Sequence, residues 1–189
     1  MKKFIYSVLS LLFILLISGC STFNSILNNN SIENSLDLAK ELNKDSSLSI
    51  FTTGSYYNYS TDAKDYYEHT ITWINENIDS WETEEDIAGI TGAEAIATHF
   101  VNNMDSITDS SYVGIEGEEY ISGIFIYNHS TPPSITAEQI DAANTIANYN
   151  GEAYYVSGNY IITIDYNFMN GNLLDFDKIV ELIDNTLNK

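Results

Sequence analysis

The side chains best suited to catalysis or metal binding are three histidines and many carboxylates. His69 follows Glu68, and His99 lies five residues after Glu94, each on the flank of an expected helix, while His129 precedes two prolines. Imidazole and carboxylate together form zinc sites and general acid–base pairs, provided that they converge. Because all three lie on a helix flank or in a loop, where polar residues are usual, we expect structural histidines that are exposed or half-buried. A shared metal site is the alternative.

Two acidic stretches could offer oxygen ligands to a cation. Residues 116–119 read Glu-Gly-Glu-Glu, and residues 165–177 hold three aspartates around an Asn-Gly turn. A calcium loop of the twelve-residue type needs Gly at position 6 and Glu at position 12. Counted from Asp165, these positions are Asn170 and Phe176. We therefore expect a solvated hairpin tip in the first stretch, with contact to a cation or a cationic partner as the alternative. In the second stretch we expect a turn with a helix cap, with a calcium loop as the alternative.

Tyrosine is unusually frequent, with 14 residues in the chain. Tyrosine combines a large contact area with one polar tip, which suits the recognition of glycans or proteins. It is also a good strand former. Packing and a binding face are both consistent with the two clusters, which comprise Tyr56, Tyr57, Tyr59, Tyr66 and Tyr67, and Tyr149, Tyr154, Tyr155, Tyr160 and Tyr166.

The N-terminus has the features of an export signal. Lys2 and Lys3 precede an apolar run at 4–17, which is too short to span a bilayer. The run ends in Ile17-Ser18-Gly19-Cys20, which resembles the lipobox of bacterial lipoproteins, with Ile in place of the commoner Leu. The resemblance implies that residues 1–19 are a signal peptide and that Cys20 receives a diacylglycerol. Two or three acyl chains anchor a protein stably in a membrane.

Composition excludes several classes of function. The net charge is −20, from 27 acidic residues and 7 lysines, with no arginine. Sequence-independent binding of nucleic acid needs clustered positive charge, and so does electrostatic binding to anionic lipid. Both are therefore excluded for this chain. Cys20 is the single cysteine, so an internal disulfide is excluded.

The remaining sequence predicts alternating helices and hairpins. The prolines, glycines and capping residues place the boundaries, with capping boxes at Thr91–Glu94 and Thr136–Gln139. Helices are expected at 32–44 (capped by Ser31), 63–79 (capped by Thr61 or Asp62), 91–103, 136–149 and from Asp175 to Leu187, with a short turn of helix from Thr83 to Gly89. Strands are expected at 47–53, 112–115, 120–127, 153–156 and 160–166.

These elements predict an α+β fold. Hairpins beside helices favour an antiparallel or mixed sheet of about five strands, with helices packed mainly on one face. The expected organisation is a signal peptide at 1–19, a lipidated cysteine and polar tether at 20–30, and one domain at 31–189.

No hydrolase, phosphate-loop or dinucleotide-binding motif is present, so no catalytic residue, cofactor or metal is assigned. We expect a lipid-anchored lipoprotein of the cell or outer membrane, with its domain outside the cytoplasm. Its function is expected to be non-enzymatic binding of a protein, peptide or glycan. The alternative is a cell-envelope hydrolase or metal-dependent enzyme using carboxylates with His69 or His99.

Overall fold

The computed structural model describes residues 32–56, 64–78, 81, 83–117, 121–172 and 174–188. The lipobox with Cys20 lies outside these residues, as do the expected helix caps Ser31, Thr61 and Asp62. Residues Glu33–Lys189 form one structural unit, distinct from Met1–Ile32.

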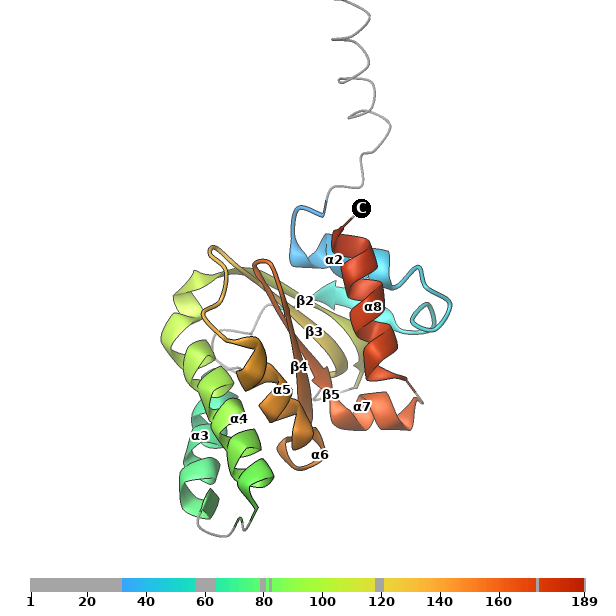
Figure 1. Ribbon diagram of the computed structural model, residues 1–189. Coiled ribbons are helices and arrows are strands. Elements are labelled where there is room, and N and C mark those ends of the chain that lie inside the picture. Colours follow the sequence, from blue (N-terminus) through green and yellow to red (C-terminus); the bar gives the residue numbers. More distant parts are fainter. Residues whose placement is uncertain are drawn as a thin grey trace, which may run out of the picture. The chain divides into compact units, whose positions relative to one another are not determined.

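One antiparallel five-stranded sheet runs through this unit, which agrees with the prediction of an antiparallel or mixed sheet of about five strands. Its strands are β1 (Thr52–Ser55), β2 (Ile107–Glu116), β3 (Ile121–His129), β4 (Glu152–Ser157) and β5 (Tyr160–Asp165). Their order in the sheet is β1-β2-β3-β5-β4 (Figure 1). Because β5 lies between β3 and β4, the start of β3, the start of β4 and the end of β5 lie at the same end of the sheet.

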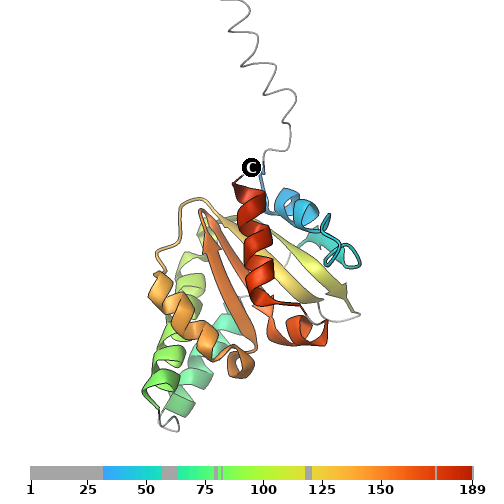
Figure 2. The same ribbon diagram turned by 45° about the vertical axis from the view of Figure 1, so that its right-hand side comes forward.

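Helices cover both faces of the sheet (Figure 2). The larger layer consists of α3 (Lys64–Asn77), α4 (Glu84–Asn103) and α5 (Ala137–Thr145), and the other face is covered by α2 (Ser35–Leu42) and α8 (Phe176–Leu187). The prediction of an α+β fold is therefore confirmed, with the larger helical layer on one face and two further helices on the other. Three short elements join the rest: the 3-10 turn η3 (Met104–Ser106), α6 (Ala147–Asn150) and α7 (Tyr166–Gly171).

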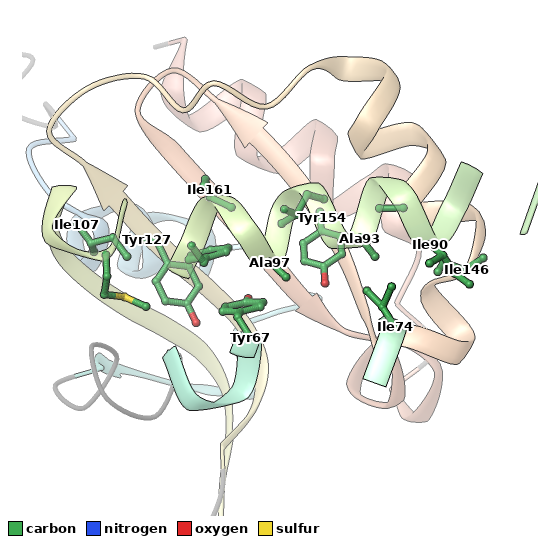
Figure 3. Packing of buried hydrophobic residues seen from close by; sticks show 14 residues of the cluster. Tyr67, Ile74, Ile90, Ala93, Ala97, Ile107, Tyr127, Ile146, Tyr154 and Ile161 are labelled. Atoms are coloured by element: carbon green, nitrogen blue, oxygen red, sulfur yellow. The ribbon is translucent and has the colours of Figure 1, made fainter. Parts of the chain in front are cut away.

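The main core lies between the sheet and the larger helical layer. Figure 3 shows Tyr127 and Tyr154 extending from the sheet toward α3, where Tyr67 lies on the facing side. Tyr67 also stacks on Phe100 of α4, with ring centroids 4.3 Å apart. Alternate residues of β3, such as Ile124 and Ile126, are buried against the opposite layer. Both faces of the central strands are thus packed.

Several predicted helix and turn boundaries are confirmed. Thr136 and Gln139 form a complete capping box at the start of α5. Asp175 caps α8 by accepting a hydrogen bond from the backbone N–H of Asp177. Gly151 follows α6 with a φ of 84°, in the left-handed region that favours glycine. The helix predicted at 136–149 is not continuous, however, because Ile146 separates α5 from α6.

The predicted break at Gly89 and new start at Thr91 are wrong, because α4 is continuous through both. Thr83 caps it, and the Thr91 hydroxyl donates to the carbonyl of Ile87 inside the helix. Gly92 lets α5 approach closely, since a Cβ there would lie 2.4 Å from the carbonyl oxygen of Gln139. Gly89, which the sequence predicts as a helix stop, lies in the same helix–helix contact, since a Cβ there would lie 2.6 Å from Cγ2 of Ile146 at the end of α5.

The strand predicted at 47–53 is also wrong over most of its length, because residues 43–50 form turns and β1 begins only at Thr52. The side-chain amide of Asn43 donates to the carbonyls of Leu48 and Phe51, at 2.7 and 3.0 Å. Asp45 accepts from both the backbone and the hydroxyl of Ser47. Side chains that bond nearby backbone compete with strand pairing, and here they prevail over the apolar alternation.

Smaller differences concern the ends of elements. Asn34, not Ser31, caps α2, by accepting from the backbone N–H of Asp37. The strand predicted to reach Tyr166 ends at Asp165, and Asn170 and Gly171 belong to the end of α7 rather than to a separate turn. Among the described helices, none combines the length and the apolar composition required to cross a bilayer.

Candidate functional site

A pocket of about 410 Å³ opens at the end of the sheet where β3 and β4 begin and β5 ends. Its volume is within the usual range for small-molecule sites, about 300–1,000 Å³. Aromatic side chains and two carboxylates dominate its walls. The lining residues are Tyr56, Tyr66, Tyr67, Ile121, Phe125, Tyr127, Gly151, Glu152, Asp165 and Asn167.

The two carboxylates of the pocket come from paired strands. Glu152, the first residue of β4, is the register partner of Asp165, the last residue of β5. Directly opposed residues of an antiparallel pair project from the same face, with Cβ atoms about 5 Å apart. Two acids therefore face the same pocket.

Glu152 is half-buried beneath tyrosine hydroxyls. The hydroxyl of Tyr67 donates to Glu152 Oε2 at 3.3 Å, and Tyr154 also hydrogen-bonds the carboxyl. Burial raises the pKa of the Glu152 carboxyl to about 7, and the nearby charge of Asp165 acts in the same direction, while the tyrosine hydrogen bonds oppose them. This carboxyl therefore changes charge near neutral pH, where an ordinary glutamate is fully ionised.

Asp165 has a structural task in addition to its place in the pocket. Its Oδ1 accepts from the backbone N–H groups of Asn167 and Phe168, which caps α7. Its Oδ2 accepts from the hydroxyl of Ser122, at 2.8 Å. Both oxygens are thus engaged within the protein, so Glu152 is the carboxylate with more freedom to meet a ligand.

The aromatic residues form a buried floor and a more accessible wall. Tyr67 and Tyr127 are almost fully buried, and burial together with the charge of Glu152 raises the pKa of each well above the usual value for tyrosine. They are neutral hydrogen-bonding groups at physiological pH. Tyr56 and Phe125 are partly exposed and meet edge-on at 5.4 Å, and Tyr66 is 42% exposed.

The candidate histidines lie elsewhere, and the expectation that all three are exposed or half-buried is wrong for His129, which is buried. His69 is exposed on α3, and His99 and His129 form a separate pair with ring centroids 5.5 Å apart. Ser106 Oγ lies 2.8 Å from His129 Nδ1, and burial lowers the pKa of His129 to about 4, assisted by His99. Within the described residues, no group of three or more His, Cys, Asp or Glu side chains could hold a metal ion.

The acidic stretches give no converging cluster in the described residues. Glu116 is exposed and accepts a hydrogen bond from Tyr112, at 3.1 Å. Glu118 and Glu119 lie outside the described residues. Asp165 and Asp175 both cap helices, as expected for the second stretch.

Glu152 is a site residue that the sequence did not lead us to predict, although a signal for it was present. The two-residue turn at Gly158-Asn159 joins β4 to β5, so Ser157 faces Tyr160. Counting outward along the hairpin brings Glu152 opposite Asp165. The covering of this pair by α3 depends on tertiary packing and has no comparable signal.

No protein-family model matches the chain. No curated protein and no solved structure matches it either. The function must therefore be inferred from the chemistry of the pocket and of the N-terminal motif.

Proposed function

We propose that this chain is a lipid-anchored lipoprotein of the bacterial cell envelope, whose α+β domain binds a ligand outside the cytoplasm. The motif Ile17-Ser18-Gly19-Cys20, behind two lysines and an apolar run, supports anchoring through a lipid on Cys20. The protein is thus attached to the membrane through this lipid. The ligand is a small chemical group, either free or carried by a protein, peptide or glycan.

The observation that carries the binding function is the pocket. Partly exposed aromatic rings line it beside a half-buried carboxyl, which is the combination of apolar walls and a few polar groups found in ligand sites. No histidine is among its lining residues in the described part of the chain. This composition favours recognition over the metal-dependent chemistry that a His–carboxylate cluster would support.

One observation favours the alternative of an envelope hydrolase. A carboxyl with a pKa of about 7 suits a general acid, and Glu152 has a second carboxylate opposite it. However, a general acid needs a partner that activates water or attacks the substrate. Asp165 accepts three hydrogen bonds within the protein, which leaves it poorly placed for that role.

The anchor is tested by replacing the acceptor of the lipid. Cys20→Ser is expected to abolish the acyl mass on the mature N-terminal peptide and to prevent cleavage before residue 20. Mass spectrometry of the protein extracted from membranes measures both. Ser21→Ala is the matched control, since it alters the next residue and leaves the thiol. Normal cleavage before residue 20 in Cys20→Ser, with a peptide mass that differs from that of the unmodified protein only by the exchange of sulfur for oxygen, would contradict lipidation.

Ligand binding is tested by closing the pocket. Asn167→Trp places an indole at a lining position of α7, whereas Asn170→Trp places it at an exposed position of the same helix outside the lining. Saturation-transfer NMR of the full-length protein in detergent, with mixtures of peptides, oligosaccharides and small amines, reports binding. The proposal expects signals that survive Asn170→Trp and vanish in Asn167→Trp. Signals that are absent from the unmodified protein, or equal in both variants, would contradict it.

A further inference from the structure

The pocket has acids and no base among its described lining residues. Its two carboxylates lie opposite each other, and no lysine, arginine or histidine is among those residues. Two ion pairs of the described residues, Lys44–Glu41 and Lys64–Glu68, involve neither of these carboxylates. A ligand with a positive charge would therefore supply what these carboxylates lack.

Resting on the proposed binding function, we propose that this pocket binds an organic ammonium group. The Glu152 carboxylate is the counter-ion, and the rings of Tyr56, Tyr66 and Phe125 form the wall against the carbon substituents. Aromatic faces attract cations because of the ring quadrupole, and aromatic cages are a recurrent way to hold alkylated ammonium groups. The three rings are all partly exposed and line the pocket.

Size and ligand chemistry favour an organic cation over a metal ion. The pocket of about 410 Å³ accommodates a group with several carbon atoms. Divalent metals need several converging oxygen or nitrogen ligands, and the described residues provide no such group. The engagement of both Asp165 oxygens leaves Glu152 as the main counter-ion, which matches a single ammonium charge.

The charge of the whole chain supports the same ligand class. The net charge of −20 produces a negative potential that raises the local concentration of cations and repels anions. An apolar-walled pocket focuses this field on the two carboxylates. The effect is not specific to one cation, so the aromatic wall must select an organic ammonium over sodium or potassium.

Binding is expected to be coupled to ionisation of Glu152. The groups that face this carboxyl are Tyr66 and Tyr67 from α3, Tyr127 from β3, Tyr154 from β4 and Asp165 from β5. The four tyrosines have raised pKa values and stay neutral, and the negative charge of Asp165 disfavours ionisation of Glu152. Since an ammonium ion favours the ionised carboxyl, affinity for a permanently charged ligand falls about tenfold from pH 8 to pH 6.

Isothermal titration of the full-length chain in non-ionic detergent tests the proposal. The probes are choline, whose charge is independent of pH, and the dimethylbutanol isomer in which an uncharged tert-butyl group replaces the trimethylammonium group of choline. A blocked tripeptide with a central lysine, and the same peptide with that lysine acetylated, test whether the ammonium group can be carried by a peptide. We expect at least one charged probe to bind tenfold or more tightly than its neutral partner.

Two variants assign the effect to the pocket. Glu152→Gln keeps the shape of the side chain and removes its charge, and it is expected to weaken binding at least tenfold and to abolish the pH dependence. Glu181→Gln removes one carboxylate from an exposed position on α8, and it is expected to change the affinity less than twofold. Equal weakening by both variants would mean that only the general charge matters, which overturns the proposal.

The outcomes separate this inference from the binding function on which it rests. If neutral probes or oligosaccharides bind in a way that Asn167→Trp abolishes, while neither charged probe binds better than its partner, the ammonium assignment is wrong and the pocket remains a ligand site. If no probe, peptide or oligosaccharide binds, both proposals fail. Preference for choline over the lysine peptide indicates a small free ligand, and the reverse preference indicates a peptide.

Discussion

Two titratable side chains, one half-buried and one buried, lie at opposite ends of β3 and differ in their hydrogen bonding. At the end that begins with Ile121, Glu152 lines a pocket and accepts hydrogen bonds from tyrosines. At the other end, His129 is 1% exposed, and its Nε2 has no hydrogen-bond partner among the described residues. The first arrangement provides a group with donors and room for a ligand, whereas the second resembles an imidazole buried by packing.

The two sites also make stability depend on pH in opposite directions. Glu152 has a pKa above that of an unfolded glutamate, so the unfolded chain loses its proton first and stability falls as the pH rises toward 7. His129 has a pKa below that of an unfolded histidine, so the unfolded chain gains a proton first and stability falls as the pH drops from 6.5 toward 4. Each of these two contributions to the pH dependence of stability can be removed by one substitution.

The largest expected effect belongs to His129, because it is the more buried group. His129→Gln removes the titration, so the loss of stability on acidification below pH 6.5 shrinks. The lowered pKa of His129 corresponds to a total loss of about 3 kcal/mol in the free energy of unfolding. About 2 kcal/mol of this loss occurs above pH 5. Urea unfolding of the variant and the unmodified protein at pH 6.5 and 5 measures this difference.

The control for this prediction removes a different imidazole. His69→Gln changes an exposed residue of α3 outside the His99–His129 pair. If His129→Gln and the unmodified protein lose the same free energy of unfolding between pH 6.5 and 5, then burial of His129 does not hold its pKa down.

Glu152→Gln should have a somewhat smaller effect with the opposite sign. Glu152 is only half-buried, so we expect about 2 kcal/mol from a pKa of about 7. Between pH 4.5 and pH 8 the variant should gain this much stability relative to the unmodified protein. If the free energy of unfolding varies with pH in the same way in Glu152→Gln and in the unmodified protein, then Glu152 ionises as easily as an exposed glutamate.

The same experiment needs a correction for general charge, because the chain is strongly acidic. Glu181→Gln removes one negative charge on the opposite face of the sheet and reports how self-repulsion varies with pH. The difference between the profiles of Glu152→Gln and Glu181→Gln isolates the buried carboxyl.

Tyr67→Phe tests the hydrogen bonding that distinguishes the pocket from the histidine pair. Loss of the donor to Glu152 should raise the pKa of that carboxyl above about 7, with a stability cost of about 1 kcal/mol. A carbon-13 NMR titration of the Glu152 carboxyl measures the change. Tyr155→Phe removes a hydroxyl that donates to Asp184 of α8, and it should leave the Glu152 titration unchanged.

Local sequence predicted the parts of the pocket that depend on local rules. The alternating residues and the Gly158-Asn159 turn define the β4–β5 hairpin, and the residues before α5 and α8 are recognisable caps. The predicted stop at Gly89 is wrong because this glycine serves the close approach of α5, which is distant in sequence. Likewise, nothing local indicates that α3 places Tyr67 over Glu152, which gives this carboxyl its special environment.

The smallest predicted effect on stability concerns Asp165, and it tests whether this carboxylate contributes to ligand binding as Glu152 does. Ser122→Ala removes one hydrogen bond to Asp165, while the two backbone N–H groups of α7 still hold its other oxygen. We expect a loss of about 0.5–1 kcal/mol in stability and less than a twofold change in ammonium affinity. Ser130→Ala, at an exposed position after β3, is the control for removing a hydroxyl. A change in affinity much greater than twofold, in either direction, would show that Asp165 contacts the ligand directly, so that both carboxylates rather than Glu152 alone recognise the charge.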